Sequence, residues 1–140
     1  MNTKVLLAAL AGGVTCFLLG WLFYGILLMD FFANNQGSAT GVMKDEASMG
    51  WIPLILGNLA TGLLFAMIYS RWANISTFRT GAIGGSWVGL LMALGYNLSM
   101  LGTSNIMNAT AALVDSALWA VFGALIGGVV GWTLGYGNRT

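Results

Sequence analysis

Long apolar stretches alternate with short polar connections along this chain. Stretches such as Val5–Met29 and Ala111–Trp132 are apolar on every side of a helix, whereas each helix of a soluble bundle needs one polar face. Each stretch is near or above the roughly 20 residues that an α-helix needs to cross hydrocarbon. We therefore predict an all-α integral membrane bundle of four transmembrane helices, over about residues 4–29, 51–72, 80–101 and 109–136.

Polar residues mark the ends of these segments. An outer loop over residues 30–50 follows the first helix and holds Lys44, Asp45 and Glu46. Pro53 falls in the first turn of the second helix, where its missing N–H costs nothing. The first apolar segment is longer than the roughly 7 to 15 residues of a signal-peptide core, so we expect it to be retained as a span. We expect a single transmembrane domain over residues 1–140.

Positive charges are divided unevenly between the two ends of the predicted helices. Lys4, Arg71, Arg79 and Arg139 lie at one end, and Lys44 stands alone at the other. Positive residues in short loops are retained in the cytoplasm. The bias therefore predicts that both termini, and the loop between the second and third helices, are cytoplasmic.

The first and third predicted helices share a weak internal repeat. Both would cross the membrane in the same direction, so a duplication would be of a parallel helical hairpin. Chance similarity is the alternative, because glycine-rich helices match one another easily. The matched residues are Gly12 and Gly13 with Gly84 and Gly85, Leu18 and Leu19 with Leu90 and Leu91, and Tyr24 with Tyr96.

Composition excludes several classes of function. Hydrophobic residues make up 58% of the chain and charged residues 6%, against roughly 25% charged in a soluble domain, so the lipid bilayer is the expected partner. With a net charge of +1 and no Lys/Arg cluster, nucleic-acid binding lacks its electrostatic source. The chain has no histidine and one cysteine, Cys16, which removes the usual ligands of catalytic zinc and haem. We expect no cofactor and no metal site.

Many of the 21 glycines fall inside the predicted helices at intervals of four residues. Glycine at i and i+4 flattens one helix face, so that a neighbouring backbone can approach closely in lipid. We interpret these rows as helix-packing surfaces of the glycine-zipper type. They face another helix of the same chain or, as the alternative, a second copy or a larger membrane protein. The rows are Gly81, Gly85 and Gly89 in the third helix, and Gly123, Gly127, Gly131 and Gly135 in the fourth.

Polar side chains recur at one level in the outer half of the predicted bundle. Two aromatic residues lie near this level: Tyr96 could donate to a carboxylate there, and Trp119 lies one turn further in on the fourth helix. A carboxylate in a span faces protein or water, because its ionised form costs about 2.5 to 3.5 kcal/mol at the bilayer centre. Each helix contributes one residue, about one to two turns from its outer end: Tyr24, Asn58, Asn97 and Asp115.

Two interpretations of this level remain open. The residues form a closed hydrogen-bonded network that holds the helices together, or they line an outward-opening cavity in which Asp115 binds a cation or a proton. An enzyme that uses Asp115 with Ser116 or Tyr24 is a third hypothesis, but no paired base and nucleophile occur at a convincing spacing. We therefore expect a protein that is not an enzyme.

The first helix carries the run Gly20–Leu27, which reads Gly-Trp-Leu-Phe-Tyr-Gly-Ile-Leu. It resembles the Gly-x-x-Trp-Tyr-Gly-Pro-Leu-Phe element of a family of small bacterial four-helix membrane proteins of unknown function. This chain has Phe23 where the family has tryptophan, and Ile26 where the family has proline. The third and fourth helices are also similar in length and glycine placement. The resemblance implies the four-helix architecture and a bacterial inner membrane, and it transfers no site.

We expect a small membrane protein that binds or passes a small solute, cation or proton through a polar pocket in its outer half. The alternative is a structural or accessory protein whose glycine rows dock it in a homo-oligomer or onto a larger membrane complex. The first hypothesis predicts that Asp115, Asn58 and Asn97 face one water-accessible cavity. The second predicts a closed polar network and an exposed glycine face.

Overall fold

The computed structural model describes residues 2–137, a range built of helices and loops with no strand. The predicted all-α class is confirmed. The first helix, α1, continues into a π-helical turn, η1, and is followed by the short helix α2; a 3₁₀ turn, η2, precedes α3, which continues into a second π-helical turn, η3. The elements in chain order are α1 (Thr3–Leu22), η1 (Phe23–Leu27), α2 (Met29–Asn34), η2 (Glu46–Ser48), α3 (Trp51–Met67), η3 (Ile68–Ala73), α4 (Phe78–Thr103) and α5 (Ala109–Gly135).

Three helical segments within residues 2–137 are long and apolar enough to cross a membrane: Thr3–Leu27, Trp51–Ala73 and Ala109–Gly135. They indicate an integral membrane protein. The remaining long helix, α4, has 26 residues, which is about 39 Å at 1.5 Å per residue and enough to cross. It is not among the three apolar segments, because glycines and polar residues such as Ser86 and Asn97 interrupt its apolar positions.

Side-chain caps set where three of the long helices begin. The first backbone N–H groups of a helix have no partner within it, and Asn or Thr at the cap position accepts from one of them. These caps are local in sequence, so the starting points do not depend on tertiary packing. The pairs are Asn2 with the Val5 N–H (3.0 Å), Thr77 with the Thr80 N–H (3.2 Å) and Asn108 with the Ala111 N–H (2.9 Å).

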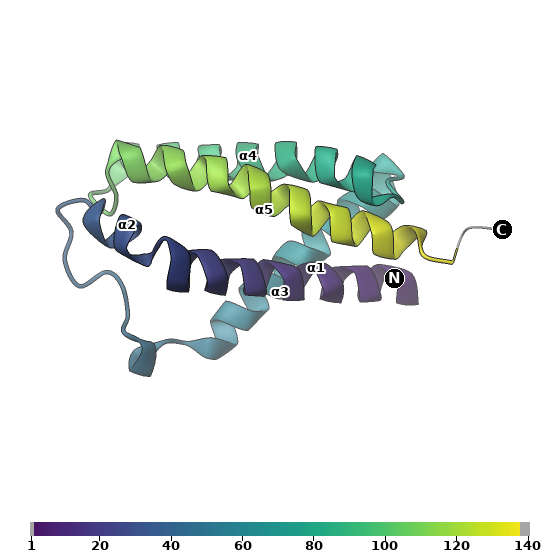
Figure 1. Ribbon diagram of the computed structural model, residues 1–140, viewed down its shortest axis with the longest axis horizontal. Coiled ribbons are helices and arrows are strands. Elements are labelled where there is room, and N and C mark those ends of the chain that lie inside the picture. The colour runs from purple at the N-terminus through teal and green to yellow at the C-terminus, as the bar shows by residue number, and fades with distance from the viewer. Residues whose placement is uncertain (1, 138–140) are drawn as a thin grey trace.

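Three helices, α1, α4 and α5, run side by side along the long axis of the molecule, and α3 crosses behind them at a slant (Figure 1). α5 is central, because it packs against both α1 and α4, whereas α3 packs chiefly on α1. The first two turns of α3, residues 51–57, are exposed. This half of α3 diverges from the other helices, and its second half returns to the bundle.

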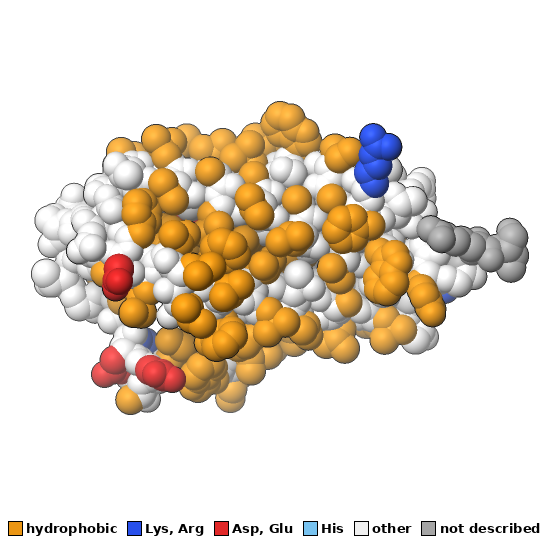
Figure 2. Space-filling model, in the orientation of Figure 1, with side chains coloured by type: hydrophobic (Ala, Val, Ile, Leu, Met, Phe, Trp, Pro, Cys, Tyr) orange, Lys and Arg blue, Asp and Glu red, His pale blue; other side chains and the backbone are white. Residues whose placement is uncertain are grey.

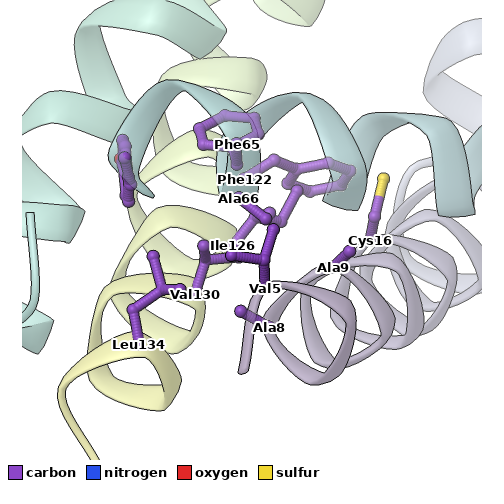
Figure 3. Close-up of a cluster of buried hydrophobic side chains, with 11 residues drawn as sticks. Val5, Ala8, Ala9, Cys16, Phe65, Ala66, Phe122, Ile126, Val130 and Leu134 are labelled. Atoms are coloured by element: carbon purple, nitrogen blue, oxygen red, sulfur yellow. The ribbon is translucent and has the colours of Figure 1, made fainter. Parts of the chain in front are cut away.

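A hydrophobic core lies where α1, α3 and α5 meet (Figure 3). The rings of Phe65 and Phe122 are buried there, with 0% and 1% exposure. α1 and α3 also touch directly through glycine, since a Cβ on Gly62 would overlap the backbone of Ala9 and Gly13. The core therefore fixes the half of the bundle that lies away from the exposed start of α3.

The two glycine rows face each other between α4 and α5. A Cβ on Gly85 would overlap the carbonyl oxygen of Gly123, and a Cβ on Gly123 would overlap that of Gly85. Gly81 and Gly127 are related in the same way. Both rows are occupied within the chain, so neither is the exposed groove that the docking hypothesis predicts. The remaining members also lie against backbone carbonyls: Gly89 against Trp119, Gly131 against Thr77 and Gly135 against Ser76.

The two ends of the bundle differ in charge. We call the end at which α1 begins and α5 ends the basic end, and the opposite end the acidic end. Figure 2 shows the acidic side chains gathered at one end and hydrophobic side chains over the middle of the molecule. The acidic end also carries Lys44, while Arg139 lies outside the described residues. The basic end has Lys4, Arg71 and Arg79, and the acidic end has Asp30, Asp45 and Glu46.

Loop segments close the acidic end, in an arrangement that we call the clasp. Two backbone hydrogen bonds of 3.0 Å join residues 37–39 to residues 105–106. Asn35 and Asn108 are paired twice, through backbone atoms at 3.2 Å and through their side chains at 3.1 Å. The clasp ties the end of the first helical segment to the α4–α5 hairpin, about two turns of α5 beyond Asp115.

Candidate functional site

Asp115 lies in the second turn of α5, and side chains from two other helical segments hold its carboxylate. The Tyr24 hydroxyl, from η1 at the end of α1, donates to Oδ1. The Asn97 amide, from α4, donates to Oδ2 at 2.6 Å. Three segments that are distant in sequence therefore converge on one carboxyl group. We call Tyr24, Asn97 and Asp115 the polar cluster.

Asn97 is the buried member of the cluster, with 1% exposure. Its amide nitrogen also lies 3.1 Å from Ser116 Oγ and 3.3 Å from the Ala112 carbonyl oxygen. An amide has two hydrogens, so the short contact to Asp115 takes one of them and the two longer contacts share the other. The Ser116 hydroxyl donates to the Ala112 carbonyl at 2.7 Å. The α4 side of the cluster is thus sealed within the α4–α5 interface.

Tyr24 is positioned by a π-helical turn and by aromatic neighbours. Such turns are rare and occur frequently at functional sites, and Tyr24 is the second residue of this one. Its ring packs against Phe32 and Phe122, with ring centroids 5.3 and 5.9 Å away. The side chain of Trp119 lies beside its hydroxyl. Aromatic rings therefore form an apolar wall on the α1 side of the carboxylate.

The electrostatic character of the site follows from the partners of Asp115. Within residues 2–137 both of its hydrogen-bond partners, a phenol and an amide, are neutral. These donors satisfy the carboxylate oxygens without neutralising the charge. The side chain is half-buried in a segment apolar enough to lie in lipid. The arrangement can accept a positive charge, either a proton on the carboxylate or a small cation beside the oxygens of Asp115 and Tyr24.

Two of the predicted site residues lie elsewhere. The Asn58 amide donates to the Leu54 carbonyl of its own helix at 2.7 Å, and Tyr96 is 63% exposed on the outer surface of α4. The Asn58 backbone lies beside Gly13 of α1, eleven residues before Tyr24, because α3 crosses the other helices at a slant (Figure 1). Tyr96 precedes the inward-facing Asn97, and adjacent helical residues point about 100° apart. The expectation that all these side chains meet at one point is therefore wrong for Asn58 and Tyr96.

Two cavities between the helices also lie away from Asp115. One, of about 290 Å³, is at the basic end between the start of α1 and η3. The other, of about 250 Å³, is a groove between α1 and α3 that Asn58 lines together with apolar side chains such as Phe17 and Ile55. Asp115 lines neither of them. Neither of these two cavities is therefore an outward cavity shared by Asn58, Asn97 and Asp115.

One polar neighbour of the cluster was not predicted. The sequence predicts for Ser116 only the role of a nucleophile, but this residue is 2% exposed and its hydroxyl joins Asn97 to the α5 backbone. The available signal was the residue type, because small polar residues on an apolar helix mark helix–helix interfaces in membranes.

Among residues 2–137, no three His, Cys, Asp or Glu side chains come close enough together to hold a metal ion.

Comparison with protein-family models, with curated proteins and with solved structures found no match to this chain. The resemblance of residues 20–27 to a family of four-helix membrane proteins therefore stays a prediction.

Proposed function

We propose that this chain is a small, non-enzymatic inner-membrane protein that crosses the bilayer four times and takes up a proton or a small cation at Asp115. The observation that carries the proposal is a half-buried carboxylate in an apolar helix, held by neutral donors from two other helical segments. An ionisable residue within a span is costly and is usually placed there for function.

A four-span topology is supported by α4 as well as by the three apolar segments. The glycine contacts from Gly81 to Gly89, and the Asn97 side chain further along, keep α4 against α5, so a membrane-spanning α5 carries α4 into the bilayer with it. Lys4, Arg71 and Arg79 lie at one end, which by the positive-inside rule is cytoplasmic. Both termini would then be cytoplasmic, and Asp115 would lie in the half of the membrane away from the cytoplasm.

Uptake of a positive charge follows from the energetics of the site. An ionised aspartate costs about 2.5 to 3.5 kcal/mol at the centre of a span and less near its end. A proton or a cation on Asp115 removes that cost, and its loss restores it. Because Tyr24 and Asn97 belong to other helical segments, a change of charge on Asp115 would alter the strength of the contacts between α1, α4 and α5.

The rival proposal, an accessory protein that docks by a glycine row, has less support. Gly81, Gly85 and Gly89 of α4 are buried against α5, and the α5 row lies against α4 and the residues that precede it. A docking role would therefore need a surface other than the glycine rows. The closed network that the accessory role predicts needs only polar side chains, whereas proton or cation uptake also accounts for the choice of an ionisable one, Asp115, inside a span.

Water accessibility of the Asp115 level tests the proposal. The experiment uses Asp115→Cys in a Cys16→Ser background and a membrane-impermeant thiol reagent added from the non-cytoplasmic side. Leu113→Cys is the control, because Leu113 is 59% exposed at nearly the same depth of α5 and faces lipid under this proposal. We expect labelling at 115 and protection at 113. Protection at both positions, in variants that insert and remain monodisperse, would contradict uptake from that side.

A further inference from the structure

The cavity at the basic end is independent of the Asp115 site and has a different chemistry. It has a volume of about 290 Å³ and lies between the start of α1, η3, the connection that follows η3, and the end of α5. Val5 and Leu134 provide apolar lining. Its polar lining comes from Asn2, Lys4, Ser70, Asn74 and Ser76.

These polar groups can all donate hydrogen bonds. Lys4 brings an ammonium group, and Ser70 and Ser76 bring hydroxyls. The Asn2 Oδ1 already accepts the Val5 N–H at 3.0 Å, so its amide hydrogens remain as donors. Several donors and a cation around one cavity suit an anion with multiple acceptor oxygens.

Ser70 gives a second, independent indication. Within residues 2–137, its Oγ is a buried side-chain oxygen without a hydrogen-bond partner. A buried hydroxyl left unpaired costs free energy, and such groups in proteins usually have a partner in a water, an ion or a ligand. Ser70 lines the cavity, so a ligand there would be close to it.

The distribution of charged residues favours an anionic ligand in this cavity. The chain has four Asp and Glu residues; Asp30, Asp45 and Glu46 lie at the acidic end, and Asp115 lies in the adjoining half of α5. No carboxylate side chain of residues 2–137 therefore lies at the basic end, while Arg71 and Arg79 add positive charge at that end of the bundle. Basic pockets between membrane helices at the cytoplasmic boundary bind anionic lipid headgroups.

We propose that this cavity binds a phosphate group, either the headgroup phosphate of an anionic phospholipid or free phosphate. The site needs the chain to lie in a membrane, but it does not depend on proton or cation uptake at Asp115. The phosphate oxygens accept from Lys4, Ser70 and the asparagine amides, and a lipid acyl chain would continue along the apolar surface of α1. Either proposal can fail while the other stands.

The test is native mass spectrometry of the full chain released from nanodiscs that contain equal amounts of phosphatidylglycerol and phosphatidylcholine. We expect preferential retention of phosphatidylglycerol, reduced about fivefold by Lys4→Gln and unchanged by Lys44→Gln, which removes the same charge at the acidic end. Ser70→Ala should also weaken retention while leaving thermal stability unchanged, because its hydroxyl has no partner to lose. Lys4→Arg should restore retention.

Inorganic phosphate distinguishes the two sources. In a detergent without anionic lipid, a phosphate-dependent rise in unfolding temperature that Lys4→Gln abolishes would identify free phosphate. Retention of phosphatidylglycerol without that rise would identify the lipid headgroup. Equal lipid loss in the Lys4→Gln and Lys44→Gln variants, or no dependence on Lys4 and Ser70 with either probe, would overturn the proposal.

Discussion

The helices α3 and α5 have nearly equal hydropathy and very different surroundings. In an apolar stretch of 18 residues within α5, 44% of the residues are buried within the molecule. In the corresponding stretch of the span formed by α3 and η3, 17% are buried. What differs is the distribution of small and polar side chains: α5 has a glycine row against α4 and a carboxylate bonded to two other segments. The comparison teaches that in lipid, where apolar residues gain little by leaving the solvent, small and polar residues determine which helix becomes central.

The largest effect should come from breaking the α4–α5 contact at Gly85. A leucine there would push against the Gly123 carbonyl, a backbone group that cannot move aside, and should lower the free energy of unfolding by about 3 kcal/mol. Gly95→Leu is the matched control, because nothing lies within 4 Å of the Cβ position at Gly95 on the same helix. Unfolding in mixed micelles measures both. An equal loss of unfolding free energy in the two variants would show that the glycine rows do not hold α4 and α5 together.

A pair of asparagines compares α4 with α3 directly. Asn97→Leu removes the donor to Asp115 and leaves Ser116 and the Ala112 carbonyl with fewer partners, so we expect a loss of about 1 to 3 kcal/mol in unfolding free energy. Asn58→Leu removes only a bond within its own helix and should change stability by less than about 0.5 kcal/mol. A larger loss of unfolding free energy in Asn58→Leu than in Asn97→Leu would mean that α3 contacts the polar cluster in the membrane.

A pair of tyrosines gives the smallest expected difference. Tyr24→Phe deletes one interhelical hydrogen bond to Asp115, which in membrane proteins contributes about 0.6 to 1.7 kcal/mol. Tyr96→Phe deletes a hydroxyl from a side chain that is 63% exposed and should leave stability unchanged. Unfolding titrations of the two variants in the same lipid measure the contrast, and equal stabilities would remove Tyr24 from the account.

Much of the helical layout is readable from the sequence, because apolar length and local caps are local properties. The fourth helix is expected over about 109–136 and runs from Ala109 to Gly135. The short helix α2 (Met29–Asn34) lies largely within the expected outer loop of residues 30–50 and is not predicted, because Asp30 and the polar residues from Asn34 onward indicate the end of a helix. The clasp was also missed, because its backbone hydrogen bonds leave no mark on residue type.

The polar cluster was predictable in part. Depth along each helix placed Tyr24, Asn97 and Asp115 at one level, but depth does not give the direction of a helix or its rotation. That is why Asn58, on the divergent half of α3, and Tyr96, on the outer surface of α4, were wrongly included. Tyr24 and Tyr96, which match each other in the weak internal repeat of the first and third helices, thus have different surroundings. The repeat stays a prediction.

An infrared titration of the protein in lipid tests charge uptake at Asp115, because it detects protonated carboxyl groups. Asp115→Asn removes the group in question, and Asp45→Asn is the control, because bonds from the Ser48 hydroxyl and N–H hold the pKa of the exposed Asp45 carboxyl below its usual range. We predict a protonated-carboxyl band that changes with pH or on addition of a small cation and is absent only in Asp115→Asn. A spectrum in which no such change depends on Asp115 would contradict the account.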